Sequence, residues 1–171
     1  MSIVLIGYRG SGKTTIGRKL ADRLWQPFVD SDELVIKNAG KSIKEIFEQH
    51  GEPHFRDLEA QAVREACALS EHVIALGGGA LGREENRIAL KQAGHKVIYL
   101  RCEPQELLRR IQADPQTSAA RPNLTGLGGG IEEVVALLGE REPMYRAAMT
   151  AELDVTRLSP EEAVVYIARL V

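Results

Sequence analysis

The sequence has few of the features that mark secreted, metal-binding or membrane proteins. Its only two cysteines, Cys67 and Cys102, lie far apart and outside any CxxC spacing, which argues against a disulfide framework and against a zinc site. No apolar run approaches the length of a membrane span, and no basic leader precedes the first apolar residues. We therefore expect a cytoplasmic protein that makes no contact with a membrane.

An excess of positive charge is also missing. The chain has 22 Lys and Arg residues against 24 Asp and Glu residues, so its formal net charge is -2. Proteins that bind nucleic acid usually carry a basic excess, and we expect no nucleic-acid partner. If the protein handles small anions, its cationic side chains must be concentrated in one cleft.

What the sequence does have is a regular alternation of short apolar runs with longer segments of helical spacing. Several runs are almost continuously apolar, as in strands that are buried on both faces of a parallel sheet. A capping-box pattern at Ser42 and prolines at Pro104 and Pro160 mark the starts of helices. The alternation predicts one doubly wound α/β domain over residues 1–171. The expected strands are Ile3–Ile6, Phe28–Val29, Val73–Leu76, Val97–Leu100 and Leu153–Val155.

One segment matches neither the strand period nor the helix period. Residues 114–130 read DPQTSAARPNLTGLGGG and are rich in Pro, Ser, Thr and Gly. Long irregular stretches in compact domains are usually functional loops or disordered segments. We interpret this segment as a mobile lid.

The most specific motif is GYRGSGKT, which begins at Gly7 and matches G-x-x-x-x-G-K-[ST] between a predicted strand and a predicted helix. A chance glycine-rich turn would match it in on the order of one chain in a hundred of this length. Backbone N–H groups and a helix N-terminus in such a loop cradle the phosphates of ATP. Lys13 should reach the β- and γ-phosphates, and the Thr14 hydroxyl should bind Mg²⁺. Tyr8 and Arg9 fill free positions of the motif, where we expect them to be exposed. The predicted ATP-binding residues are Gly10, Ser11, Gly12, Lys13, Thr14 and Thr15.

Two acids follow the second predicted strand, in the segment Phe28-Val29-Asp30-Ser31-Asp32. Their spacing would point both side chains the same way at the carboxyl end of the strand, where ligands bind in open α/β sheets. Asp30 would equally serve as the N-cap of the following helix. From the residues alone, capping and a role near Mg²⁺ are comparable interpretations of Asp30.

Further polar and glycine residues suggest an acceptor site. Arg56 and Glu59 share one helix face at i, i+3, although such a pair can also be a surface ion pair of little consequence. Gly77, Gly78 and Gly79 follow the third strand and would let a ligand approach the backbone closely, with a flexible turn as the alternative. A guanine-reading N-K-x-D element is missing, which counts against a GTPase.

Taken together, these motifs resemble those of the shikimate kinases over nearly the whole chain. The segments that carry the resemblance are GYRGSGKTT, FVDSD, SIKEIF, GE..FR..E, ALGGG, ARPNLTG and GEREPMYR, in this order. The resemblance implies a three-layer P-loop fold of the nucleoside-monophosphate-kinase type, with a five-stranded parallel sheet and a closing lid. It also implies Mg²⁺-dependent transfer of the γ-phosphate of ATP to the 3-hydroxyl of shikimate, which gives shikimate 3-phosphate and ADP in aromatic amino acid biosynthesis.

The resemblance further implies a role for individual residues. Asp32 would bind the hydroxyls of shikimate, and Asp30 would belong to the Mg²⁺ shell together with Thr14. Arg56 and Arg141 would hold the substrate carboxylate, for which guanidinium forks are well matched. The other implied residues are Glu59, which would orient Arg56; Gly77, Gly78 and Gly79, which would contact shikimate; Arg157, beside the adenosine; and Arg121, which would close over the transferring phosphate. Lys13, Asp32 and Arg121 would be the catalytic residues.

Two other functions stay open at the level of sequence. One is a related small-molecule kinase, for instance one that acts on gluconate. The other is a nucleotide-binding homologue without catalysis, although such a protein should have lost Lys13, Thr14, Asp32 or Arg121, and all four are present. By the resemblance, Arg109 or Arg110 would be the arginine that stacks on adenine, with a place on a plain surface helix as the equal alternative. We expect a monomer.

Overall fold

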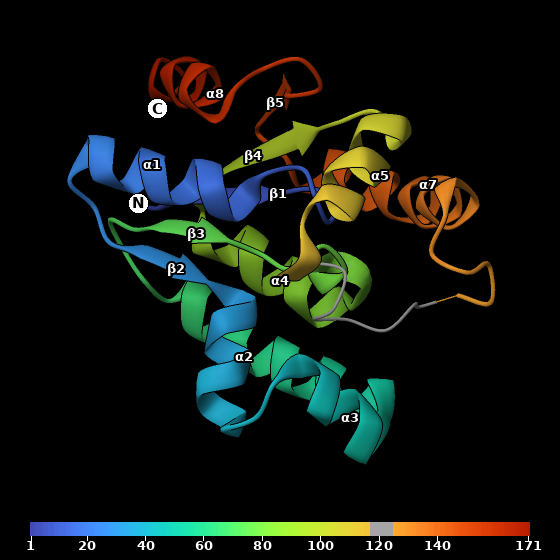
Figure 1. The fold of residues 1–171 in the computed structure, drawn as a ribbon. Coiled ribbons are helices and arrows are strands. Elements are labelled where there is room, and N and C mark those ends of the chain that lie inside the picture. The colour runs from blue at the N-terminus through green and yellow to red at the C-terminus, as the bar shows by residue number, and fades with distance from the viewer. Residues whose placement is uncertain (117–124) are drawn as a thin grey trace.

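The sheet has five parallel strands in the order β2-β3-β1-β4-β5. In the computed structural model, which describes residues 1–116 and 125–171, the central strand β1 pairs with β3 on one side and with β4 on the other. This is the predicted α/β architecture (Figure 1). The strands are β1 (Ile3–Ile6), β2 (Phe28–Asp30), β3 (Val73–Ala75), β4 (Lys96–Arg101) and β5 (Ala151–Asp154).

Helices cover both faces of the sheet and make it the middle of three layers. Helices α1 and α8 lie on one face, and α3, α4 and α7 lie on the other (Figure 1). Within the two described ranges, none of the helices combines the length and the apolar character that crossing a bilayer requires. The helices are α1 (Lys13–Leu24), α2 (Ser31–Ala39), α3 (Ile43–Cys67), α4 (Glu84–Ala93), α5 (Pro104–Ala113), α7 (Ile131–Ala148) and α8 (Pro160–Ala168), with a short 3-10 turn, η1 (Ala80–Gly82).

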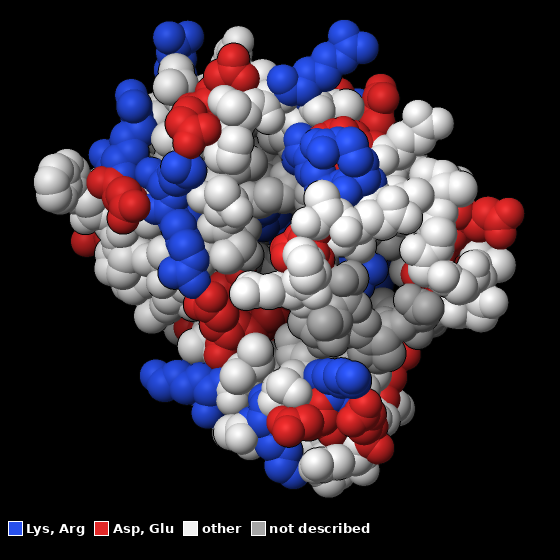
Figure 2. Space-filling view, viewed as in Figure 1, with Lys and Arg blue, Asp and Glu red and all other residues white. Residues whose placement is uncertain are grey.

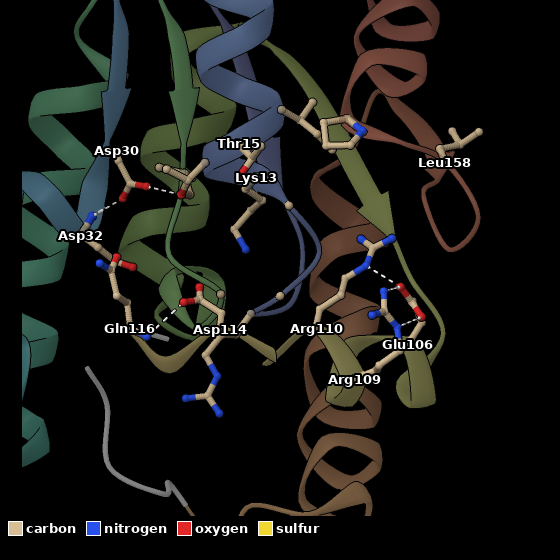
Figure 3. Close-up of a pocket in the computed structure, with 18 of the residues that line it drawn as sticks. Lys13, Thr15, Asp30, Asp32, Glu106, Arg109, Arg110, Asp114, Gln116 and Leu158 are labelled. Atoms are coloured by element: carbon tan, nitrogen blue, oxygen red, sulfur yellow. Dashed lines mark hydrogen bonds and ion pairs between the residues drawn. The ribbon is translucent and has the colours of Figure 1, made fainter. Parts of the chain in front are cut away.

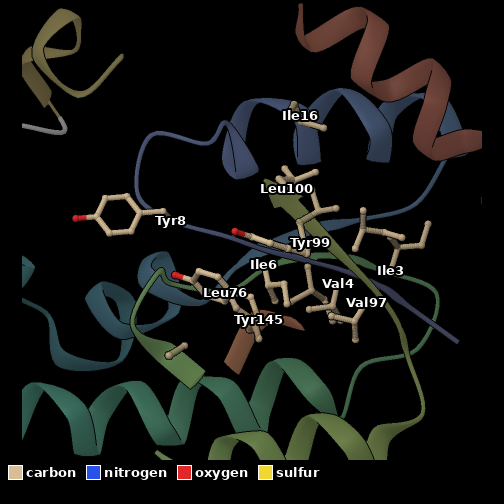
Figure 4. Packing of buried hydrophobic residues seen from close by; sticks show 14 of the residues in the cluster. Ile3, Val4, Ile6, Tyr8, Ile16, Leu76, Val97, Tyr99, Leu100 and Tyr145 are labelled. Atoms are coloured by element: carbon tan, nitrogen blue, oxygen red, sulfur yellow. The ribbon is translucent and has the colours of Figure 1, made fainter. Parts of the chain in front are cut away.

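The core forms around β1, whose four residues are all buried. Side chains of β3, β4 and the flanking helices pack against it, including the large rings of Tyr99 and Tyr145 (Figure 4). A second, smaller cluster joins α2 to α3 and includes Val35, Ile46 and Phe55. The α2–α3 unit therefore has apolar packing of its own beside the main core.

Helix α3 carries a break that matters for the site. It starts at the predicted capping box, in which Ser42 Oγ accepts from the backbone N–H of Glu45 and the Glu45 side chain accepts from that of Ser42. At Gly51 the backbone turns to φ 82°, a conformation that glycine adopts without strain. Pro53 lies in the first turn after this break, where its missing N–H costs nothing. Arg56 and Glu59 belong to this second part of α3.

Candidate active site

A cleft of about 930 Å³ opens at the carboxyl edge of the sheet (Figure 3). It runs between the P-loop, the start of α2, the C-terminal part of α5 and the segment from Thr156 to Pro160. Nine of the predicted site residues line it: Gly10, Gly12, Lys13, Thr14, Thr15, Asp30, Asp32, Gly78 and Arg157. Three of the sequence motifs, GYRGSGKTT, FVDSD and ALGGG, thus meet at one cleft although they are far apart along the chain.

The cleft is lined by charged side chains of both signs, in a protein whose net charge is -2. Lys and Arg side chains flank the central hollow in the space-filling view, with acidic side chains among them (Figure 2). The cationic residues of the lining are Arg9, Lys13, Arg109, Arg110 and Arg157, and the acidic ones are Asp30, Asp32, Glu106 and Asp114. The cationic side chains of the lining outnumber the acidic ones by one, so the balance of charge in the cleft is opposite in sign to that of the whole molecule.

The P-loop has the backbone shape of a phosphate cradle. Gly10 and Gly12 have φ of 86° and 94°, values that L side chains rarely adopt, and α1 begins directly after them at Lys13. The Nζ of Lys13 donates to the carbonyl oxygens of Gly7 at 2.8 Å and of Tyr8 at 2.9 Å. The loop, the ammonium group and the positive end of α1 therefore converge on the cleft.

Two P-loop residues differ from what the motif alone suggests. Ser11 is fully buried; its N–H donates to the carbonyl of Tyr8, and its hydroxyl has no hydrogen-bond partner within the described ranges. The expectation that Tyr8 is exposed was wrong, because its side chain is only 4% exposed and belongs to the main core. Arg9 is half-buried and lines the cleft. The motif fixes the backbone of its free positions but not where their side chains go.

Asp30 combines the two roles between which the sequence could not decide. Its Oδ1 accepts from the backbone N–H of Asp32 at 2.9 Å and so caps α2, while its Oδ2 accepts from the Thr14 hydroxyl at 2.8 Å (Figure 3). Burial, and next the nearby charge of Asp32, raise the pKa of Asp30 above its ordinary value. The strand ends at Asp30, so Asp32 points into the cleft from the first turn of α2 and not through strand alternation.

The glycine turn after β3 packs directly against polar side chains. A Cβ added at Gly77 would lie 2.8 Å from Asp32 Oδ1 and 3.1 Å from Glu59 Oε2, and one at Gly79 would lie 2.7 Å from Arg56 Nη1. The 2.8 Å distance to Asp32 and the 2.7 Å distance to Arg56 are shorter than the contacts that Cβ atoms make in real structures. The turn is therefore glycine-rich because the acid and the guanidinium occupy the space that side chains would need.

Arg56 is held by two carboxylates of its own helix. Its Nη1 donates to Glu59 Oε1 at 2.8 Å, and its Nη2 lies 3.3 Å from Glu52 Oε1. Glu59 is 1% exposed, and the Arg56 side chain 15%. The structure thus contains the Arg56–Glu59 pair that the i, i+3 spacing predicts. The pair is largely buried, which rules out the alternative of an ion pair at the surface.

Arg141 reaches the same turn from α7, on the other side. Its Nη1 lies 3.6 Å from the position of a Cβ at Gly78, and its guanidinium carbon lies 5.5 Å from the centroid of the Tyr8 ring. The Tyr145 hydroxyl, one helical turn further along α7, donates to the carbonyl of Gly78. Sequence reasoning missed Tyr8 and Tyr145; the i, i+4 spacing of Arg141 and Tyr145 was the available signal.

The far end of the cleft distinguishes Arg110 from Arg109. Arg110 donates from Nη2 to the carbonyl of Val155 at 2.8 Å and from Nε to Glu106 Oε1 at 2.8 Å. Arg109 contacts only Glu106 among the partners found in the described ranges, and its side chain is 67% exposed. Hydrogen bonds from Arg109 and Arg110 lower the pKa of Glu106 to about 2, so this carboxylate stays charged near neutral pH. Arg110 thereby joins α5 to the segment that leads to Arg157.

Part of the predicted site lies outside the described residues. Arg121 belongs to 117–124, and the predicted lid, 114–130, includes this range. Asp114 and Gln116, at the near end of the lid segment, line the cleft. Ser11, Arg56, Gly77, Gly79 and Arg141 are described but do not line the cleft; the last four border its acceptor end through Gly78 and Asp32.

Comparisons with known proteins relate the chain to one family. The family model described as shikimate kinase matches residues 9–171. A shikimate kinase of Thermobifida fusca is 43% identical over 166 residues, which cover 97% of this chain and 92% of the relative. A shikimate kinase of Symbiobacterium thermophilum is 43% identical over 98% of this chain and 94% of its own length. The solved structure of a shikimate kinase from Acinetobacter baumannii in complex with shikimate superposes with a TM-score of 0.90, at 32% identity, over 99% of this chain and 91% of that chain.

Proposed function

Because this chain belongs to the shikimate kinase family, we propose that it transfers the γ-phosphate of ATP to the 3-hydroxyl of shikimate. The observation that carries the proposal is that the P-loop borders the glycine turn Gly77–Gly79. Asp32, Arg56 and Arg141 lie against this turn. A Cβ at Gly78 would lie 3.2 Å from the backbone nitrogen of Arg9, so the turn borders the loop directly. A donor phosphate and an acceptor bound at these two segments would be neighbours.

The acceptor side suits a hydroxylated carboxylic acid. We propose that Arg56 and Arg141 bind the carboxylate, because each presents a guanidinium beside the glycine turn and guanidinium forks match carboxylates. Asp32, beside Gly77, would accept hydrogen bonds from the substrate hydroxyls. Gly77, Gly78 and Gly79 would contact the ring through their backbone, and Glu59 would orient Arg56.

Thr14 and Asp30 would hold Mg²⁺. Their hydroxyl and carboxylate oxygens are the hard ligands that Mg²⁺ prefers, and Mg²⁺ usually combines one or two such protein ligands with substrate phosphates. The buried Asp30 beside the charge of Asp32 has a raised pKa, and a cation there would offset both the burial and the repulsion. When bound, the ion would neutralise charge on the β- and γ-phosphates.

The residues support a direct in-line transfer. Phosphoryl transfer generally has a loose transition state, so the acceptor hydroxyl needs orientation more than full deprotonation. Asp32 would orient that hydroxyl, and Lys13 and Arg121 would bind the charge that spreads over the equatorial oxygens. Gly10, Ser11, Gly12 and Thr15 would support the phosphates through the P-loop, and Arg157 would lie beside the adenosine. A lid over 114–130 would exclude water, which otherwise competes as acceptor.

The proposal is tested by ADP release from Mg²⁺ and ATP with shikimate, with gluconate and with buffer alone. We expect release that depends on shikimate, together with a product whose mass has increased by one phosphoryl group. ADP release with gluconate and not with shikimate would mean that gluconate, and not shikimate, is the phosphate acceptor. ATP binding without turnover on either compound would favour the non-catalytic alternative.

Arg110→Ala is expected to raise the KM for ATP by about 10-fold and to leave the KM for shikimate within about twofold. The change removes the bonds that tie α5 to the carbonyl of Val155 and so loosens the adenosine end of the cleft. Arg109→Ala is the matched control, since Arg109 precedes it on the same helix and also borders the cleft but, as far as the structure describes the chain, hydrogen-bonds Glu106 alone and does not tie α5 to Val155. Equal effects of the two variants on ATP would contradict this assignment.

We also propose that the protein is monomeric and cytoplasmic, without nucleic-acid or membrane partners. The balanced charge supports the absence of nucleic acid, and the use of ATP fits the cytoplasm. Sedimentation at micromolar concentration tests the oligomeric state, with a mass near 18.8 kDa expected.

A further inference from the structure

We propose that Tyr8 and Tyr145 are positioning residues that hold the Arg141 guanidinium against the glycine turn and thereby set the affinity for the acceptor carboxylate. This inference rests on the proposed function, because it assigns the role of Arg141 to substrate binding. Neither tyrosine reaches the lining of the main cleft in the described ranges, so both would act through Arg141.

Tyr145 connects Arg141 to the glycine turn. The ring is 1% exposed and packs against Tyr99 with a centroid distance of 5.1 Å, which fixes its direction. Its hydroxyl donates to the carbonyl of Gly78. Arg141 lies one turn earlier on the same helix, with its guanidinium near enough to Tyr145 for its positive charge to act on this hydroxyl. The buried Tyr145 side chain therefore joins α7 to the glycine turn directly beside the Arg141 guanidinium.

Tyr8 supports the guanidinium from the P-loop side. Its ring, 4% exposed, faces the Arg141 guanidinium at 5.5 Å, within the range of a cation–π contact. Tyr8 extends from the carboxyl end of β1, and Tyr145 lies on the α7 side of the sheet (Figure 4). The acceptor arginine is thus held between the donor loop and the glycine turn.

The two acceptor arginines are held by different chemistry. Arg56 is paired with Glu52 and Glu59, whose negative charges offset its own. Arg141 forms no ion pair among the described residues, and its two aromatic neighbours are neutral. Neutral supports fix the direction of a guanidinium without offsetting its charge, so Arg141 retains more attraction for a carboxylate. The tyrosines would supply orientation at no electrostatic cost.

The test compares Tyr145→Phe, which removes only the hydroxyl, with Tyr8→Leu, which removes the aromatic face, and Tyr8→Phe, which restores it. We expect the KM for shikimate to rise about 10-fold in Tyr145→Phe and about 3- to 10-fold in Tyr8→Leu. Tyr8→Phe should return to within about twofold of the unchanged protein, because the cation–π contact needs only the ring. The KM for ATP should stay within about twofold throughout. Tyr166→Phe, on the exposed side of α8, is the matched control.

Each outcome bears on a separate claim. A rise in the KM for shikimate together with an equal rise in the KM for ATP indicates general damage to the fold and overturns the positioning role. An unchanged KM for shikimate in Tyr145→Phe or Tyr8→Leu removes that tyrosine from the proposal. If Tyr145→Phe fails to fold by circular dichroism, the Leu and Phe variants of Tyr8 decide the matter. Absence of shikimate-dependent turnover in the unchanged protein would instead refute the proposed function.

Discussion

Asp32→Asn is expected to lower kcat by about 100- to 1,000-fold while the KM for ATP changes by less than about threefold. Asparagine keeps the size of the side chain but replaces one carboxylate oxygen by an NH2 group, which donates hydrogen bonds, and removes the negative charge. It could no longer accept a bond from the attacking hydroxyl with full negative charge. Because Asp32 lies against Gly77, at the acceptor end of the cleft, ATP binding at the P-loop should hardly change. Steady-state ADP release and equilibrium ATP binding measure the two quantities.

The control for this variant is Asp57→Asn. Asp57 lies on α3, is 67% exposed at its side chain and pairs with Arg83 at the surface, so its loss should leave kcat unchanged. Near-normal turnover of Asp32→Asn would remove Asp32 from the catalytic residues. A parallel loss of ATP binding would mean that the variant disturbs the adjoining cap of α2 by Asp30, whose Oδ1 bonds the Asp32 N–H.

Gly79→Ala is expected to raise the KM for shikimate by about 10- to 100-fold with little loss of stability. Gly79 has φ of -100°, which alanine adopts without strain, so the backbone can stay as it is. The new methyl group would fall 2.7 Å from Arg56 Nη1 and 2.8 Å from Nη2, and the guanidinium would have to move. The end of a long side chain can shift while it keeps its pairing with Glu59, but the carboxylate site depends on where that end lies. Shikimate titration of the initial rate measures the effect.

Gly82→Ala provides the comparison within the same segment. Gly82 ends η1, and a Cβ there would meet nothing within 4 Å, so we expect neither the KM nor the melting temperature to change. A KM of Gly79→Ala within twofold of the unchanged protein would show that Arg56 can bind the substrate from a displaced position. In that event the acceptor carboxylate would depend mainly on Arg141.

The sequence predicts the positions of strands best where both faces of the strand are buried. Ile3–Ile6 is apolar throughout and was predicted with its observed bounds. The last strand was expected at Leu153–Val155 but spans Ala151–Asp154, because β5 is an edge strand whose side chains alternate between half-buried and exposed. The apolar-run signal is weak in such a strand. The break of α3 at Gly51 was also missed, since apolar spacing continues on both sides of it.

The site was predictable where a motif dictates backbone shape and less so where packing decides. Gly10, Gly12 and Lys13 lie as the P-loop motif requires. The burial of Glu59 and of Tyr8 was not foreseen, because it depends on what the glycine turn and α7 bring beside them. The two interpretations of Asp30 were not exclusive: its two oxygens point to different partners. Spacing along one segment could not show that both are satisfied.

The pairing of β1 with β3 has a consequence for how far the phosphoryl group must travel. The two loops that would bind the reactants leave the sheet one residue apart in register, after Ile6 and after Ala75, with Leu5 opposite Ala75. Neighbouring strands are held about 4.8 Å apart by their backbone hydrogen bonds. If these loops bind the two reactants, the ladder between the two strands would set where both loops start, and side-chain substitutions in the loops would leave that ladder unaltered. Residues of the proposed acceptor pocket could then change, and with them the choice of acceptor, while the starting points of the two loops stay in place.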